Sequence, residues 1–272
     1  MFFQGCRPPS IFLREKAMRS LTVRFLKFLC LCVIGGIQTN AAPTEKTVVL
    51  FDGSGTNLFV SSTGSESDWR MEDGALVSTP NTRRSNNLVS RLHFRDAEIE
   101  LQFLQPSDTD GNSGVFLHGL YEIQILTTKG KQKLTNHDMG AIYGLYAPLV
   151  NADQGSGKWQ TLKILFHAPR RDESGQLTAE GSITAWLNGE KIHDDAKVGN
   201  QGSEYNPYAY DTTPYLAEIQ RIENFKGTGP LLLQDHDCPV RFRQILVKPL
   251  DDAAYLYSPA MKNSHGLPQQ ND

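Results

Sequence analysis

An acid and an amide lie two residues apart in the segment Tyr121–Leu126, whose residues favour a β-strand. Because side chains alternate between the two faces of a strand, Tyr121 and the two isoleucines share one face. Glu122 and Gln124 then stand on the other face, roughly 7 Å apart by strand rise. A carboxylate beside an amide makes a poor core face but offers the donors and acceptors that a sugar requires. The glycine-bounded segment Gly111–His118 predicts a turn and a second strand just before this pair.

The elements that position these side chains are predicted to be strands. Ala97–Phe103 and Trp159–Phe166 alternate apolar with polar residues, and Ile183–Leu187 runs into Asn188-Gly189, a strong hairpin signal. Further strand-like segments are Val48–Phe51, Trp69–Glu72, Ala75–Ser78, Asn87–Val89, Leu231–Gln234 and Val240–Val247. Only Leu216–Phe225 suggests a helix, and it is short. The pattern predicts an all-β protein, a sandwich or jelly roll of antiparallel sheets.

Two long connections interrupt the strands, and connections of this length are often functional. Thr127–Asp138 is polar and basic, whereas 199–229 contains four tyrosines among Asn and Pro: Tyr205, Tyr208, Tyr210 and Tyr215. Tyrosines on a mobile loop could stack on a sugar ring and act as a lid. They could equally pack the loop onto the domain, and the sequence leaves both interpretations open.

Residues 1–42 resemble an export signal. Basic residues precede an apolar run from Phe28 to Ile37, and small residues suited to cleavage follow it. The run is shorter than the roughly 20 residues that span a bilayer, so no stable membrane span is expected, although a retained anchor is the alternative. Met18 would be a more ordinary start for such a signal than Met1. We therefore expect an exported protein, periplasmic or extracellular, with one domain over 43–255 and a polar tail over 256–272.

Cysteine content and charge narrow the class of protein. Three of the four cysteines, Cys6, Cys30 and Cys32, precede the expected cleavage site, so an internal disulfide is not expected. The leader carries six basic residues and one acidic residue, which leaves the remainder of the chain at a formal charge of −8. An acidic exported domain does not suit nucleic acid or anionic lipid as a partner. No glycine-rich dinucleotide fingerprint follows a strand, so no organic cofactor is expected.

Several short motifs, in order from about residue 48 to 250, resemble the 3-keto-disaccharide hydrolase family. They are Leu50–Gly53, Trp69–Leu76, Gly111–Leu117, Tyr121–Leu126, Gly140–Gly144, Tyr146–Asn151, Trp159–Thr161, Phe166–Arg170, Asn188-Gly189, Leu233–His236 and Val240–Arg243. Each is weak alone, but the ordered set is very specific. The chain departs from the family pattern at His118, where Arg is common, and at Asp237-Cys238, which replaces Gly-Asn.

This resemblance implies a concanavalin-like jelly-roll β-sandwich and activity as a 3-keto-glycoside 1,2-lyase or 3-keto-2-hydroxyglucal hydratase. A ketone at C3 acidifies the C2 proton, so a base can remove it and expel the C1 substituent before water adds back. Glu122 is the candidate base, because Gln124 and Tyr143 could desolvate it. His236 is the candidate acid or a metal ligand, with Asp235 fixing its tautomer or helping to bind a cation. A separate sugar 3-oxidoreductase would have to supply the ketone.

The remaining candidates are substrate-binding residues, each with an ordinary structural role as the alternative. They are Asn112, His118, Gln124, Tyr143, Tyr146, His167, Arg170, Gln234 and Asp235. A divalent metal is chemically reasonable, because a keto sugar with an adjacent hydroxyl is a bidentate ligand. No tight ligand spacing accompanies it, so the metal stays open.

Two other functions compete with this interpretation. A retaining glycosidase needs a second carboxylate about 5–5.5 Å from the first, which sandwich glucanases supply in a Glu-x-Asp-x-Glu run. The corresponding run here, Glu122-Ile-Gln124-Ile-Leu126, lacks the second carboxylate. A non-catalytic glycan-binding module is the stronger alternative, since the same fold hosts lectin-like domains. Such a module would bind sugar without turnover and would tolerate Glu122→Gln.

Overall fold

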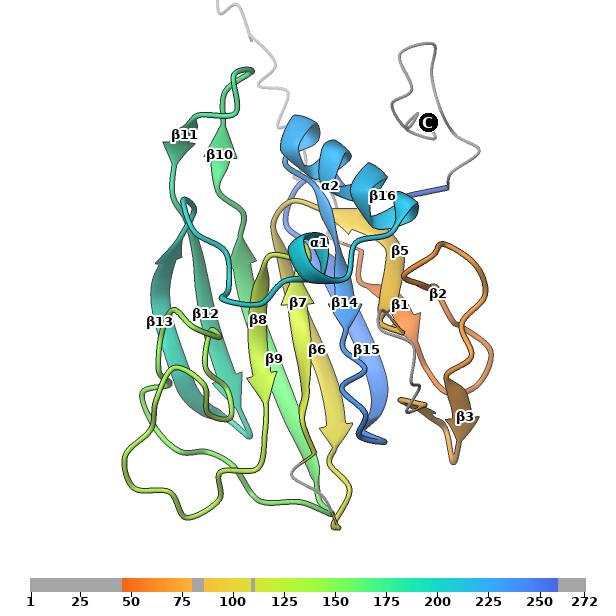
Figure 1. Ribbon diagram of the computed structural model, residues 1–272, viewed down its shortest axis with the longest axis vertical. Coiled ribbons are helices and arrows are strands. Elements are labelled where there is room, and N and C mark those ends of the chain that lie inside the picture. Colours follow the sequence, from red (N-terminus) through yellow and green to blue (C-terminus); the bar gives the residue numbers. More distant parts are fainter. Residues whose placement is uncertain (1–45, 80–85, 109–110, 259–272) are drawn as a thin grey trace, which may run out of the picture. The chain divides into compact units, whose positions relative to one another are not determined.

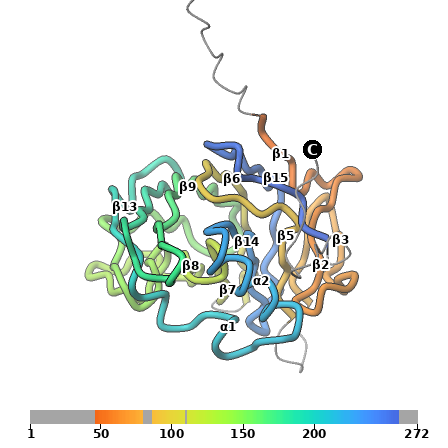
Figure 2. The backbone as a smooth tube through the Cα atoms, turned by 90° about the horizontal axis from the view of Figure 1, so that it is seen from above, coloured from red at the N-terminus to blue at the C-terminus, as the bar shows by residue number. Residues whose placement is uncertain are grey.

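Two antiparallel β-sheets face each other, and two helices lie on the outer face of the smaller sheet (Figures 1 and 2). The computed structural model describes residues 46–79, 86–108 and 111–258, all of which fall within one compact unit, Ala42–Asp272. The predicted leader, with its three cysteines, and residues 259–272 of the predicted tail lie outside the described residues. No helix in the described part is long and apolar enough to cross a membrane.

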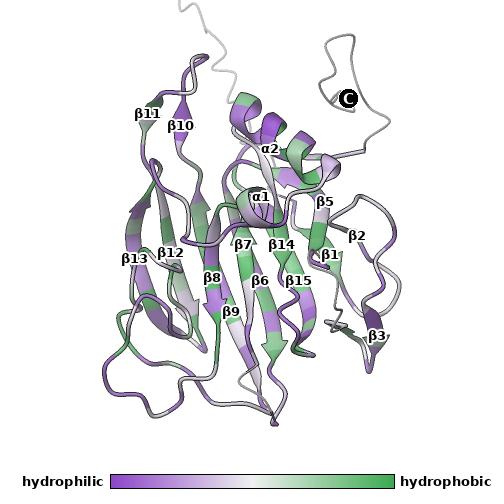
Figure 3. Cartoon of the chain, in the orientation of Figure 1, coloured by the Kyte–Doolittle hydropathy of each residue, from purple (hydrophilic) through white to green (hydrophobic). Residues whose placement is uncertain are grey.

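The larger sheet has eight strands in the order β13-β12-β9-β6-β15-β4-β3, with β1 paired to β15. These strands are β1 (Val48–Phe51), β3 (Arg70–Glu72), β4 (Ala75–Val77), β6 (Ala97–Leu104), β9 (Trp159–His167), β12 (Gly181–Leu187), β13 (Glu190–Val198) and β15 (Arg241–Pro249). The predicted Asn188-Gly189 turn joins β12 to β13, which pair with each other. Figure 3 shows hydrophobic and hydrophilic residues alternating along many of these strands, as expected for a sheet with one buried face.

The smaller sheet has six strands in the order β16-β5-β14-β7-β8, with β2 paired to β5. These strands are β2 (Phe59–Ser61), β5 (Leu88–Phe94), β7 (Ser113–Leu117), β8 (Tyr121–Ile125), β14 (Gly229–Leu233) and β16 (Tyr255–Leu256). A separate short hairpin pairs β10 (Arg170–Arg171) with β11 (Leu177–Ala179). The inner faces of the larger and the smaller sheet enclose one core that includes Phe103, Phe166 and Phe242. Burying each such ring stabilises the fold by about 1.5–3 kcal/mol.

The connection over 199–229 is largely helical, not a long irregular loop. It contains α1 (Pro207–Tyr210) and α2 (Pro214–Lys226), so the predicted helix over 216–225 is confirmed and is slightly longer than expected. Thr213 caps α2 by accepting a hydrogen bond from the Leu216 amide at 3.1 Å, and Gly227 ends it in the left-handed conformation. The buried side chains of α2 pack on Val89, Phe116 and Leu232, which cover one end of the outer face of the smaller sheet.

The predicted all-β sandwich of two antiparallel sheets is confirmed. The main strands that sequence analysis did not identify are β13, at the edge of the larger sheet, and the second half of β5. β13 is largely polar and partly exposed, which hides the alternation that marks the other strands. Cys238 is buried and not paired in a disulfide, in line with the sequence analysis.

Candidate active site

Three polar side chains and one glycine form a row on the outer face of the smaller sheet, near the ends of four neighbouring strands. Gly114 on β7 pairs with Gln124 on β8, and the Gln234 amide donates a 2.9 Å hydrogen bond to the Gly114 carbonyl. Asn87, the residue before β5, comes next in register, since Leu88 pairs with Leu233. The adjacent residues along each strand point inward, where Leu88, Leu233, Val115 and Ile123 belong to the core. The row therefore faces away from the core, just beyond the end that the helices cover.

Glu122 lies beside this row, with its carboxylate over Gly114. A β-carbon added to Gly114 would stand 2.3 Å from Glu122 Oε1, so only glycine leaves room for the acid there. Two backbone bonds hold the position: the Glu122 amide donates to Ser203 Oγ at 2.9 Å, and the Tyr143 amide donates to the Glu122 carbonyl at 3.0 Å. The side chain is 2% exposed, and burial raises the pKa of Glu122 to about 8.

The two glutamines of the row have unused hydrogen-bonding capacity. Gln124 and Gln234 are each 5% exposed, and the side-chain oxygen of each is buried without a hydrogen-bond partner in the described structure. Buried polar atoms are rarely left unpaired, since each costs about 1–3 kcal/mol. Two unpaired amide oxygens beside a desolvated carboxyl group indicate a place where a ligand that donates hydrogen bonds completes the bonding.

Tyrosines from two different loops border Glu122. Tyr143 follows β8, and its pKa is raised first by desolvation and then by the negative charge of Glu122. Tyr205 precedes α1 and packs edge-on against Phe116 at 6.0 Å, with its hydroxyl donating to Asp211. Desolvation raises the pKa of Tyr205 as well, and Glu122 contributes to that increase. Both tyrosines are thus close enough to interact with the charge of Glu122.

His236 and Asn112 lie at the far end of the same face. Nδ2 of Asn112 lies 3.5 Å from Nε2 of His236. Asn112 is two residues before Gly114, and His236 is two residues after Gln234, so both belong to the same face. Asp235 does not orient this histidine. Its carboxylate accepts hydrogen bonds from Ser78 Oγ at 2.7 Å and Asn86 Nδ2 at 2.9 Å. Burial raises the pKa of Asp235 in spite of these bonds.

Four predicted substrate-binding residues lie away from this face. His118 adopts φ +55° at the turn after β7, which directs its ring into the core against Phe94 and Phe166, at 5.2 and 4.9 Å. It is 1% exposed, and burial lowers its pKa to about 3. The hydroxyl of Tyr146 donates to the Lys197 carbonyl at 2.9 Å, beside β13. Both residues therefore fall outside the candidate site.

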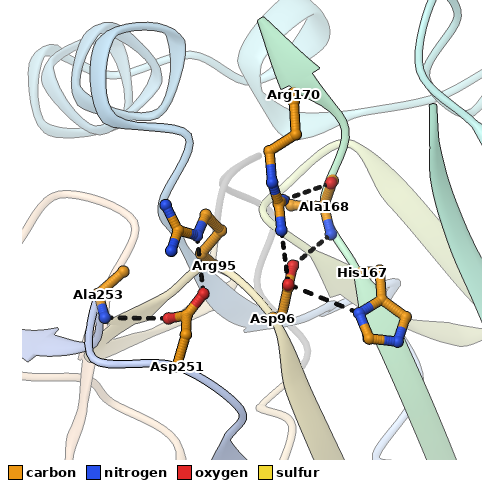
Figure 4. Close-up of polar contacts among 7 residues, drawn as sticks. All are labelled: Arg95, Asp96, His167, Ala168, Arg170, Asp251 and Ala253. Carbon is orange, nitrogen blue, oxygen red and sulfur yellow. Dashed lines mark hydrogen bonds and ion pairs between the residues drawn. The ribbon is translucent and has the colours of Figure 1, made fainter. Parts of the chain in front are cut away.

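His167 and Arg170 also belong elsewhere, at the end of β9 and the start of β10 (Figure 4). The guanidinium of Arg170 contacts the Asp96 carboxylate at 2.5 Å, and His167 Nδ1 lies 3.5 Å from the same oxygen. Figure 4 shows Asp96 between these two side chains, so the cluster ties together strand ends of the larger sheet.

Sequence analysis missed three residues of the site. Asn87 and Ser203 carried no recognisable signal, because their roles depend on contacts with residues distant in sequence. Tyr205 was noted only as one of four tyrosines in a long connection. Within the described ranges, no three His, Cys, Asp or Glu side chains are grouped closely enough to hold a metal ion.

The sequence from 46 to 248 matches the 3-keto-alpha-glucoside-1,2-lyase-like domain, and the chain belongs to this family. Among curated proteins, none matches it. A crystal structure from Parabacteroides distasonis, described as a "putative glycosyl hydrolase", is 26% identical with a TM-score of 0.62, over 75% of this chain and 84% of that one. A second structure so described, from the same organism, is 21% identical with a TM-score of 0.52, over 75% and 94% of the two chains, and shows the shared fold. The family and the first structure support the interpretation of this chain as a carbohydrate-active enzyme.

The burial of Glu122 has a consequence for stability that is independent of activity. Between pH 4.5 and about 8 the folded protein keeps a proton on Glu122 that the unfolded chain releases, so this residue lowers stability as pH rises. Glu122→Gln, which does not titrate, is therefore expected to be more stable than wild type by about 3 to 5 kcal/mol at pH 8 and by little at pH 4.5.

Urea unfolding of both proteins at several pH values measures this difference. Glu223, whose pKa is also raised by burial, is present in both proteins. Its contribution to the pH dependence of stability therefore cancels in the difference. A stability difference that stays constant from pH 4.5 to 8 would show that the Glu122 carboxyl is well solvated.

Proposed function

We propose that this protein cleaves 3-keto-glycosides by elimination and hydration, with Glu122 as the base. The observation that carries the proposal is the desolvated Glu122 carboxyl group beside two glutamines whose side-chain oxygens are unpaired, on an outer sheet face. An ordinary solvated carboxylate is too weak a base to remove a proton from carbon efficiently, whereas one with a pKa near 8 is better matched to the task.

The proposed steps balance without an oxidant or reductant. Glu122 takes the C2 proton, and the electron pair passes into the C3 ketone to form an enolate. Return of that pair forms the C1–C2 double bond and breaks the bond from C1 to the glycosidic oxygen, which takes up a proton as it leaves. Water then adds, with hydroxyl at C1 and a proton at C2, and gives the free 3-keto sugar.

Other residues of the face have roles that this chemistry requires. The unpaired side-chain oxygens of Gln124 and Gln234 would accept hydrogen bonds from sugar hydroxyls. The Nε2 groups of the same side chains would donate to the enolate oxygen and stabilise the charge that develops there. His236, exposed at the end of the face near Asn112, would protonate the leaving oxygen. The ketone must be made by a separate sugar oxidoreductase, and residues 1–42 would direct the protein to the periplasm or beyond.

Proton exchange at C2 distinguishes this mechanism from its rivals. We expect the purified protein to cleave a 3-keto-disaccharide in D₂O with deuterium entering at C2, as followed by NMR with and without added divalent metal. Cleavage without exchange would mean ordinary hydrolysis and exclude Glu122 as a carbon base. Saturable line broadening of the sugar without turnover would identify a glycan-binding module.

The rate of cleavage is also expected to depend on pH. Because the base acts in its deprotonated form, kcat/KM should rise about tenfold per pH unit below pH 8 and level off above it. Initial rates between pH 5.5 and 9.5, with the spontaneous elimination of the substrate subtracted, measure the profile. A profile that is flat across pH 6 to 8 would contradict the assignment of Glu122 as the base.

A further inference from the structure

A pocket of about 430 Å³ lies between α2, the β10–β11 hairpin and the segment 199–202. Figure 1 shows α2 and this hairpin at the same end of the sandwich, whereas the candidate active site lies along β7 and β8 beyond the helices. Arg171, Asn200, Glu223 and Asn224 contribute polar side chains to its lining. The volume is within the range of small-molecule sites, about 300–1,000 Å³.

Glu223 is the residue that points to a ligand. It lines the pocket from α2, is 8% exposed, and has one carboxyl oxygen, Oε2, that is buried without a hydrogen-bond partner. Burial raises the pKa of Glu223 to about 7, and the charge of Arg171 opposes this increase. A buried carboxyl group with unused capacity is costly, which favours a bound molecule that donates to it.

The charges that face the pocket restrict what can bind there. The Arg171 guanidinium donates to the carbonyls of Gly175, at 3.1 Å, and Gly199, at 2.5 Å, which leaves further N–H groups for a ligand. The Glu223 carboxyl group disfavours an isolated anion, and the positive charge of Arg171 disfavours an isolated cation. A neutral polyhydroxylated molecule can donate to the carboxyl group, accept from the guanidinium, and do both with the two asparagines.

We propose that this pocket is a second saccharide site, which binds a neutral hexose unit independently of the face that holds Glu122. It does not depend on the proposed cleavage reaction, because its ligand needs no ketone. The two sites are nevertheless connected through the chain. Ser203 follows the pocket wall directly, donates from its amide to the Leu120 carbonyl at 2.8 Å, and accepts from the Glu122 amide.

Titration of the full-length protein with methyl α-D-glucopyranoside tests this site. This sugar has no 3-ketone and so cannot undergo the proposed reaction. We expect saturable shifts in the amide resonances of 199–202 and Asn224, with a Kd on the order of 1 mM for a ligand of this size. Glu223→Leu and the exposed Asn224→Ala should each weaken binding about tenfold, and Glu122→Gln should not change it.

The controls separate binding in this pocket from binding elsewhere and from loss of folding. Unfolding curves of each variant show whether it is folded. If Glu223→Leu does not fold, Asn224→Ala still tests the site. Shifts confined to residues around Gln124 and Gln234, or no saturation by 50 times the expected Kd (roughly 50 mM), would overturn the second site. So would shifts of the pocket resonances with inorganic phosphate and not with the sugar. None of these outcomes affects the C2-exchange experiment on a 3-keto-disaccharide.

Discussion

Glu122→Gln is expected to lower kcat for a 3-keto-disaccharide by about 10²- to 10⁴-fold, the usual contribution of a positioned general base. Glutamine has nearly the same shape, and the carboxylate it replaces has no hydrogen-bond donor among the described residues, so folding is not impaired. KM should change little, because in the proposed complex the side-chain amides of Gln124 and Gln234 would still contact the substrate. Loss in kcat with KM retained is the sign of a group that acts mainly in the transition state.

The matched control is Glu100→Gln, which removes an exposed carboxylate from the outer face of the larger sheet. Steady-state rates of the two variants and wild type, measured by NMR at pH 8, provide the comparison. A Glu122→Gln enzyme that keeps kcat within threefold of wild type would exclude this residue as the base. A protein that binds the sugar equally well in both forms and never turns it over would be a glycan-binding module.

Gly114→Ala is expected to lower activity by about 10²-fold and to destabilise the fold by about 1–3 kcal/mol. The added methyl group would lie 2.3 Å from Glu122 Oε1 and 2.9 Å from its Cδ, distances that no relaxed contact allows. Either the carboxylate leaves its position or β7 and β8 move apart, and both outcomes misplace the base. An error of about 1 Å in a catalytic group can cost on the order of 10²-fold in rate.

Gly55→Ala is the matched control for this variant. A β-carbon at Gly55 meets no atom within 4 Å, and its φ is not positive, so neither activity nor stability should fall appreciably. Thermal unfolding and rate measurements on both variants test the prediction. Wild-type activity in Gly114→Ala would mean that the carboxylate does not need its place above β7.

The sequence alone predicted the features that depend on near neighbours along the chain. Alternation along segments such as 97–103 identified strands and their buried faces, because a pleat repeats every two residues. The same rule placed Glu122 and Gln124 together on an outward face. Asn188-Gly189 predicted the β12–β13 turn, since both positions suit positive φ, and they have φ of 53° and 87°.

Only the tertiary structure decided which residues meet across strands. Gly114 and Gln234 join Gln124 in one row because of a register between β7, β8 and β14 that no local pattern specifies. The burial that raises the pKa of Glu122 likewise depends on tertiary packing, and the hydrogen bond from the Glu122 amide to Ser203 joins residues 81 positions apart along the chain.

Single backbone angles and remote partners also redirected residues that the sequence placed at the site. A φ of +55° turns His118 into the core, and Asp96 holds His167 and Arg170 at the opposite sheet. The chain's local sequence thus determined strands, faces and the candidate acid. Register, burial and long-range contacts, which depend on the packing of the whole domain, decided the environment that raises the pKa of this acid.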